Sequence, residues 1–171
     1  DRNNGDLVRC QHESEDVAGL SKIKVQNLSL RAQGGFWIGT SSGLNWFDWE
    51  TGKVRPFKPP GDEVKGLVKG KISALHEDKE GGLWFCKERG ARRLNFETGE
   101  FVSFLHDPAD PESIGARQVN QIHEDRAGNL WFGHRSNGLS MLSRQTGKFI
   151  RIESEPYVPG RLSGVNIHSF H

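Results

Sequence analysis

One interval of 47 residues recurs along this chain and constrains its fold more than any other feature. Trp37, Trp84 and Trp131 are spaced by that interval. Three more columns keep the same step, with one extra residue in the last unit: Gly5, Gly52, Gly99 and Gly147; Leu20, Leu67, Ile114 and Leu162; Val25, Ile72, Val119 and Ile167. A period of roughly 20–50 residues is typical of solenoids, propellers and arrays.

Each unit predicts four short strands joined by tight turns. In the second unit the expected strands cover 72–78, 83–86, 90–96 and 101–104, with turns at Gly81-Gly82 and Thr98-Gly99. Four antiparallel strands in one repeat make a propeller blade, whereas the coils of a β-solenoid are much shorter. The sequence therefore predicts an all-β fold, a β-propeller fragment of four-stranded antiparallel blades.

The repeat also predicts how the chain is divided. We expect 1–24 to be the trailing strand and connection of a preceding blade, three blades over 25–71, 72–118 and 119–166, and the first strand of a following blade in 167–171. Three blades fall short of most closed rings. We expect further blades in a longer parent chain, or from partner chains. The lack of an initiator Met and of a signal peptide fits a segment excised from a longer protein.

Composition narrows the class of protein. The formal net charge is +1, which argues against nucleic acid as the main partner. No stretch of the sequence is apolar for long enough to span a membrane as a helix. The two cysteines, Cys10 and Cys86, fall in strands two blades apart, and we expect them to be free thiols.

Two motifs, His76-Glu77-Asp78 and His123-Glu124-Asp125, contain the residue types found in metal or catalytic clusters. They recur at the repeat interval, and neighbouring strand residues point to opposite faces, so we interpret them as blade architecture and predict no metal and no cofactor. The three repeated tryptophans are expected in the cores between blades. Trp46 and Trp49 are not fixed by the repeat; stacking on a sugar ring and half-buried packing both remain open for them.

The segments 72–85 and 119–133, with their shared His-Glu-Asp and Leu-Trp-Phe, resemble the two-component regulator propeller repeat, as do Thr51-Gly52 and the Asp107-Pro108 loop. The resemblance implies a periplasmic sensor region, commonly placed before a transmembrane helix and a kinase or cyclase module. It also implies ligands that are often glycan fragments. The sequence departs from the family pattern at Cys86-Lys87, at His134 and over 90–93.

Candidate binding residues cluster where the repeat is broken. Strand alternation places the connections 58–70, 105–117 and 153–165 on one face with the turns 40–42, 87–89 and 134–137. We call this the loop face. It is rich in Lys and Arg, and it predicts either a site for an anionic ligand such as an acidic sugar, or a solvated basic surface. The candidate ligand-binding residues are Lys87, Arg89, Arg92, Arg93, His134, Arg135 and Asn137.

The leading functional hypothesis is a non-catalytic sensor segment that binds a small molecule or oligosaccharide. The first alternative is an enzyme related to propeller lyases, for which His134 is the sole candidate catalytic residue. The second alternative is a scaffold that self-associates through unpaired blade edges. We expect the membrane to be involved only through other parts of the parent chain.

Overall fold

The computed structural model describes residues 24–58, 69–96, 98–135 and 138–152, and within them every regular element is a β-strand. The first sheet holds β1 (Val25–Leu30), β2 (Phe36–Thr40), β3 (Leu44–Phe47) and β4 (Val54–Pro56). The second holds β5 (Ala74–Glu77), β6 (Gly82–Lys87), β7 (Gly90–Asn95) and β8 (Phe101–Leu105). The third holds β9 (Val119–Glu124), β10 (Leu130–His134), β11 (Leu139–Leu142) and β12 (Phe149–Ile152).

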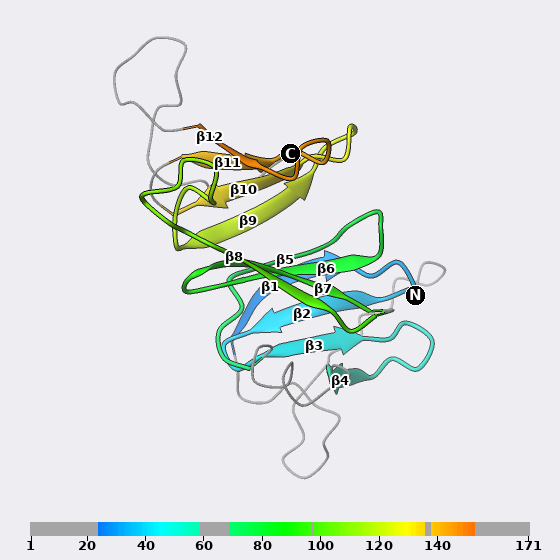
Figure 1. Cartoon of the computed structure of the whole chain (residues 1–171). Coiled ribbons are helices and arrows are strands. Elements are labelled where there is room, and N and C mark those ends of the chain that lie inside the picture. The colour runs from blue at the N-terminus through cyan, green and yellow to red at the C-terminus, as the bar shows by residue number, and fades with distance from the viewer. Residues whose placement is uncertain (1–23, 59–68, 97, 136–137, 153–171) are drawn as a thin grey trace.

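The strands of each sheet pair in sequence order and antiparallel, so each sheet is a four-stranded meander. The three sheets lie one beside another, with β5–β8 between β1–β4 and β9–β12 (Figure 1). The predicted all-β architecture of four-stranded propeller blades is confirmed. We call the sheets blade 1, blade 2 and blade 3 in chain order.

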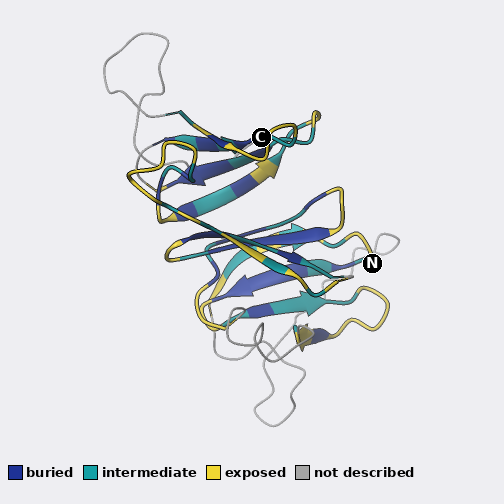
Figure 2. Cartoon of the chain, in the orientation of Figure 1, coloured by how far each residue is buried: buried dark blue, intermediate teal, exposed yellow. Residues whose placement is uncertain are grey.

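The second strand of a blade is buried on both of its faces. Leu83, Trp84, Phe85 and Cys86 of β6 are at most 1% exposed. By contrast, the outer strand β8 is half-buried or exposed along its length (Figure 2). Consecutive apolar residues in the second strand are therefore explained by neighbours on both sides, as predicted.

Two apolar cores lie between the blades. The first interface, between blades 1 and 2, buries Trp37, and the ring of Trp37 stacks on Phe96 of blade 2 at 5.3 Å between centroids. The second interface, between blades 2 and 3, buries Trp84, which meets Phe132 edge to face at 5.6 Å. Trp37 and Trp84 thus belong to the cores between blades, as the repeat predicts, whereas Trp131 is half-buried.

The turn before β6 contains two glycines, Gly81 and Gly82, each with its own physical reason. Gly81 has a φ of 79°, which a side chain rarely tolerates. A Cβ at Gly82 would lie 2.5 Å from the guanidinium of Arg93, so the missing side chain leaves room for that arginine. The sequence at this turn therefore sets the position of a charged group on β7.

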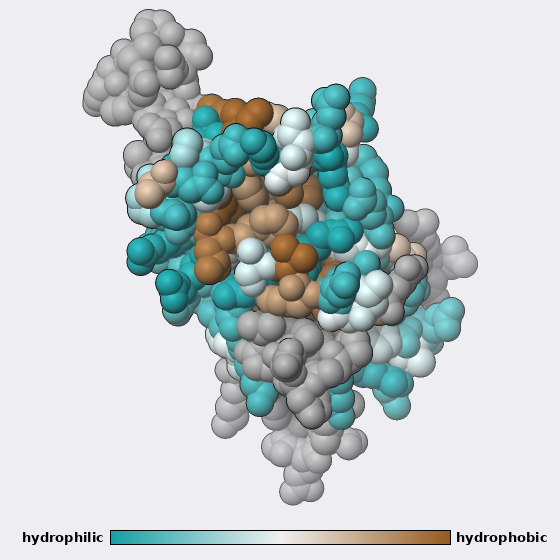
Figure 3. Space-filling model, viewed as in Figure 1, coloured by the Kyte–Doolittle hydropathy of each residue, from teal (hydrophilic) through white to brown (hydrophobic). Residues whose placement is uncertain are grey.

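The outer strands leave apolar groups on the surface. Figure 3 shows apolar residues gathered on the side of the molecule where β8 and β12 lie, where Val102, Leu105 and Ile150 are exposed. The predicted segments 1–24 and 167–171, with Cys10 and the connection 153–165, lie almost wholly or wholly outside the described residues. The predicted division of the chain into blades and part-blades stays a prediction.

Candidate functional site

The loop face is formed by the ends of strands from neighbouring blades. Gly70, just before blade 2, donates its N–H to the carbonyl of Ser42 in blade 1 at 3.1 Å. Within blade 3, the N–H of Arg135 donates to the carbonyl of Gln118 at 3.1 Å. In both places the connection that enters a blade therefore meets the turn between the second and third strands of a blade, as strand alternation predicts.

A small pocket opens on the loop face between blades 2 and 3. Its volume is about 130 Å³, and it is lined by Lys71, Ser73, Lys87, Glu88, Gln118, Val119, Asn120 and Arg135. Lys87 ends β6 and donates its Nζ to the carbonyl of Lys69, while Arg135 follows β10 and is exposed. The fold thus brings two predicted ligand-binding residues together from different blades.

Two further candidate arginines, Arg89 and Arg92, follow Lys87 in sequence and do not line this pocket. Arg89 is exposed in the turn between β6 and β7. Arg92 is half-buried on β7, and its Nε and Nη1 atoms are buried without a hydrogen-bond partner. Burial lowers the pKa of Arg92, and the charge of Arg89 lowers it further. Burial lowers the pKa of Lys87 as well, and Arg92 adds to that effect. Arg92 therefore has two guanidinium N–H groups that an anion could satisfy.

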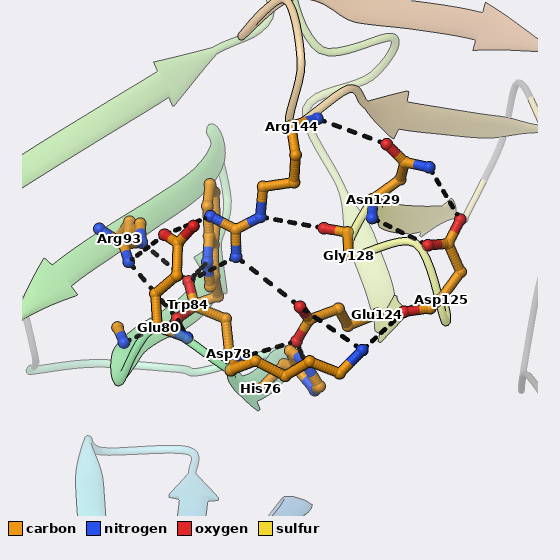
Figure 4. A network of polar contacts seen from close by, with 12 residues as sticks. His76, Asp78, Glu80, Trp84, Arg93, Glu124, Asp125, Gly128, Asn129 and Arg144 are labelled. Atoms are coloured by element: carbon orange, nitrogen blue, oxygen red, sulfur yellow. Dashed lines mark hydrogen bonds and ion pairs between the residues drawn. The ribbon is translucent and has the colours of Figure 1, made fainter.

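The structure places Arg93 away from the loop face, which corrects its predicted position. β7 runs from one end of the blade to the other, rising about 3.4 Å per residue, so its later residues approach the opposite end. There the Nε of Arg93 lies 2.8 Å from Oδ2 of Asp78 and its Nη2 lies 3.2 Å from Oε2 of Glu80 (Figure 4). Because Arg93 forms ion pairs with these two carboxylates, it is not available to a ligand on the loop face.

His134 is fully buried, which also corrects the expectation that it contacts a ligand. Its Nε2 lies 2.8 Å from Oγ of Ser140, a hydroxyl that accepts the N–H of Gly115 at 2.8 Å. Burial lowers the pKa of His134 to about 4, so the ring is neutral near pH 7. A neutral imidazole with no exposed surface supports the packing of blade 3 and cannot reach a substrate.

Asn137 lies outside the described residues, so its predicted role stays a prediction. Of the candidate residues, the structure therefore groups Lys87 and Arg135 around one pocket, whereas Arg89 and Arg92 are not among the residues that line it. It separates Arg93 and His134 from that group.

The His-Glu-Asp motifs form polar links between blades 2 and 3 at the end opposite the loop face (Figure 4). The side chain of Asp78 is fully buried. Its Oδ1 accepts the N–H of Gly82 at 2.8 Å, and its Oδ2 accepts the indole N–H of Trp84 at 2.7 Å. Burial alone would raise the pKa of Asp78, but hydrogen bonds from Arg93, Gly82 and Trp84 hold it at about 2. The carboxylate closes a turn, as predicted.

Arg144 of blade 3 completes this network. Its Nη2 lies 3.1 Å from Oδ2 of Asp78, and its Nη1 lies 2.6 Å from Oε2 of Glu80. On the blade 3 side, Oε2 of Glu124 lies 3.4 Å from Nε2 of His76. The motif residues thus serve as ion pairs and turn caps. Across the described ranges, no group of three or more His, Cys, Asp or Glu side chains could hold a metal ion.

A larger cavity, of about 680 Å³, lies at the first interface, and the sequence reasoning did not find it. It is lined by Arg31, Gln33, Trp37, Trp46, Lys53, Arg55, Pro56, Phe57, Lys58, Glu77 and Phe96. The sequence did carry a signal. Trp46 stands where the next unit has Arg93, so this column does not repeat its chemistry.

Comparison with protein families identifies the chain. A model described as the SMP-30/Gluconolactonase/LRE-like region matches residues 30–168. The chain belongs to this family. Among curated proteins, no sequence matches the chain. Membership in the SMP-30/gluconolactonase/LRE-like family agrees with the propeller blades described above. Of the residues that the structure describes, none form a helix long and apolar enough to cross a membrane.

Solved structures share the arrangement of blades. The extracellular domain of BT3049 from B. thetaiotaomicron, named as a hybrid two component system, superposes with a TM-score of 0.64 and 24% identity over 81% of this chain. That of BT4673 from the same organism gives a TM-score of 0.59 and 18% identity over 84%. This chain covers only 19% and 18% of those chains. The expected resemblance to propellers of two-component systems is confirmed at the level of the fold.

Proposed function

We propose that this chain is a segment of the extracytoplasmic, periplasmic sensor region of a two-component signalling protein, and that it binds a ligand without catalysing a reaction. The observation that carries the proposal is the loop-face pocket, where blades 2 and 3 together present Lys87 and Arg135. The extracellular placement of the similar propellers in BT3049 and BT4673 supports the location. The proposed ligand is a small, glycan-derived anion.

The charges of the pocket support an anionic ligand. Lys71, Lys87 and Arg135 face a single carboxylate, that of Glu88, around a volume that suits one carboxylate or sulfate group. Arg135 is exposed, so its planar guanidinium is free to form paired hydrogen bonds with such a group. A pocket built from two blades also offers a physical route to signalling, because a bound anion holds the blades together.

The test measures binding of an acidic oligosaccharide panel to the full chain by calorimetry and thermal shift. Binding to the native state alone raises the melting temperature. Combined substitution Lys87→Ala and Arg135→Ala is expected to weaken binding of the acidic members at least tenfold. Arg126→Ala, which removes an exposed cation elsewhere on blade 3, is the matched control. Unchanged affinity in the double variant would contradict the proposal.

The enzyme alternative keeps one supporting observation, since the description of the family includes gluconolactonase. His134, the candidate that sequence reasoning gave to this alternative, is buried and hydrogen-bonded to Ser140. Turnover of a lactone by the full chain would favour the enzyme and overturn the sensor proposal. Self-association through blade edges stays a prediction, which light scattering over a concentration series tests.

A further inference from the structure

The two interfaces between blades use the same columns of the repeat with different chemistry. At the second interface, Asp78, Arg93 and Arg144 form ion pairs that fill the space between the blades. The columns that hold these residues carry Arg31, Trp46 and Phe96 at the first interface. No carboxylate stands where Asp78 stands, and the space that the ion pairs fill at the second interface is part of a cavity of about 680 Å³ at the first.

The walls of this cavity are aromatic. Trp37 stacks on Phe96, and Phe57 meets both rings edge to face, with centroids 5.2 Å and 5.9 Å away. All three rings are held by the core of the first interface, so the wall is formed before any ligand arrives. Such a wall suits the flat apolar face of a six-membered ring.

The rim of the cavity carries two guanidinium groups placed over one indole. The Cζ of Arg31 lies 4.6 Å from the centroid of Trp46, and that of Arg55 lies 5.7 Å from the same ring. The N–H groups of a guanidinium lie in its own plane. A guanidinium stacked on an aromatic face can therefore still donate hydrogen bonds to a carboxylate. Arg55 is exposed and makes no hydrogen bond or ion pair with the described residues, so its donors are open to a ligand.

The charge around the cavity is strongly one-sided. Arg31, Lys53, Arg55 and Lys58 line it against the single carboxylate of Glu77. That carboxylate is already engaged, because it accepts the indole N–H of Trp37 and the backbone N–H of Ala32. Asp48 interacts electrostatically with Arg55 but does not line the cavity, so the lining itself has no unengaged carboxylate for the two arginines.

We propose that the cavity at the first interface is a second ligand site, which takes a small molecule of one or two six-membered rings that carries a carboxylate. The ring lies against Trp37, Phe57 and Phe96, and the carboxylate is received by Arg31 and Arg55. A volume of about 680 Å³ fits a ligand of that size. The site lies between blades 1 and 2, whereas the loop-face pocket lies between blades 2 and 3, so the two sites are separate.

Two chemical sources share this combination of ring and carboxylate, namely uronic acid sugars and aromatic acids. Calorimetry on the full chain would therefore use matched pairs: a disaccharide ending in glucuronate against the same disaccharide ending in glucose, and 2-naphthoate against 2-naphthamide. We expect at least one acid to bind with a dissociation constant below about 1 mM, and its neutral partner to bind at least tenfold more weakly. The acid that binds identifies the source.

Variants locate the binding. Arg55→Ala is expected to raise the dissociation constant of the acid at least tenfold. Arg55→Lys, which keeps the charge but loses the planar donors, is expected to weaken binding less, and Arg126→Ala should leave it unchanged. A combined Arg31→Asp and Trp46→Arg variant copies the pair formed by Asp78 and Arg93, and it should abolish binding while the protein stays folded by circular dichroism.

Several outcomes would overturn the proposal. One is that neither acid binds at about 10 mM. A second is that the acid binds but Arg55→Ala and the combined variant bind it as tightly as the parent chain. A third is that inorganic phosphate competes with the acid at equal concentration, which would show an anion site with no use for the ring. Loss of binding in the Lys87 and Arg135 double variant alone would assign the acid to the loop face instead.

Discussion

Between blades 1 and 2, Arg31 rests over Trp46 beside an open cavity; between blades 2 and 3, the same two columns hold Asp78 and Arg93 in a closed ion pair. Residues that recur in each unit play the same part at both interfaces: the second-strand tryptophan, Trp37 or Trp84, is buried at each of them. The repeat thus specifies how the blades pack, while a few variable columns determine whether an interface is closed by its own ion pairs or keeps a cavity that can accept a ligand.

The largest expected loss of stability comes from removing Asp78 at the second interface, and it can be compared with the loss of Arg31 at the first. Asp78→Ala leaves Arg93 and Arg144 without their buried counter-charge and the Trp84 indole without its acceptor, which should cost about 3–5 kcal/mol of the free energy of unfolding. Arg31→Ala at the equivalent position should cost no more than about 1 kcal/mol, since Arg31 has no buried carboxylate partner. Urea denaturation measures both. Equal losses of unfolding free energy in the two variants would contradict the claim that the two interfaces are stabilised differently.

Acid should weaken the second interface in a defined range of pH. The pKa of Asp78 is about 2 in the folded chain and 3.8 in its ordinary state, so the unfolded chain binds this proton first as pH falls. The stability that Asp78 contributes is therefore complete above about pH 4 and is lost between about pH 4 and pH 2, amounting to roughly 2 kcal/mol. Urea titrations of the parent chain and of Asp78→Asn over this range isolate the effect. The same slope in both proteins would contradict the prediction.

A smaller effect comes from replacing the residue that crosses the second interface. Arg144→Phe copies the aromatic group that Phe96 supplies at the first interface. Asp78 keeps its contact with Arg93, so the loss should be only about 1–2 kcal/mol, as measured by thermal unfolding. Arg126→Ala serves as the control for loss of an arginine. A loss as large as that of Asp78→Ala would show that Arg144, not Arg93, is the main partner of the carboxylate.

The smallest effect concerns the exposed edge of the network. The side chain of Glu80 is 61% exposed, although it pairs with both Arg93 and Arg144. Water screens such a pair, so Glu80→Ala should cost about 0.5 kcal/mol or less, and 1 M salt should remove most of that difference. Thermal unfolding at low and high salt gives the comparison. A salt-independent loss above about 2 kcal/mol would place Glu80 among the groups that hold the interface closed.

Much of the fold could be predicted from the periodic residues. The buried second strand, the turns at Gly81-Gly82 and Thr98-Gly99 and the core roles of Trp37 and Trp84 all follow from columns that recur, because each blade must satisfy the same contacts with its neighbours. The structural interpretation of His76-Glu77-Asp78 followed from the same recurrence, and the hydrogen bonds of Asp78 confirm it.

The candidate site was less accessible to sequence reasoning. Lys87 and Arg135 do meet at one pocket, but Arg93 was assigned to the loop face because the repeat is broken over 90–93 in a region rich in Lys and Arg. In a strand, neighbouring residues point to opposite faces, and Arg93 approaches Asp78 instead. Likewise, nothing in the sequence tells a buried histidine from an exposed one at the end of a second strand, and His134 is buried beside Ser140.

The repeat, the four-stranded blade and the columns that pack between blades follow from the amino-acid sequence, since a fixed period must be matched by a repeated set of contacts. Which charged side chains find partners depends on how the blades pack against one another. Asp78 meets Arg144 from a position 66 residues earlier in the chain, whereas Arg31 and Arg55 converge on Trp46 and form no ion pair with a carboxylate of the described residues. Pairing depends on distances across an interface, and such distances do not exist until the blades are packed together.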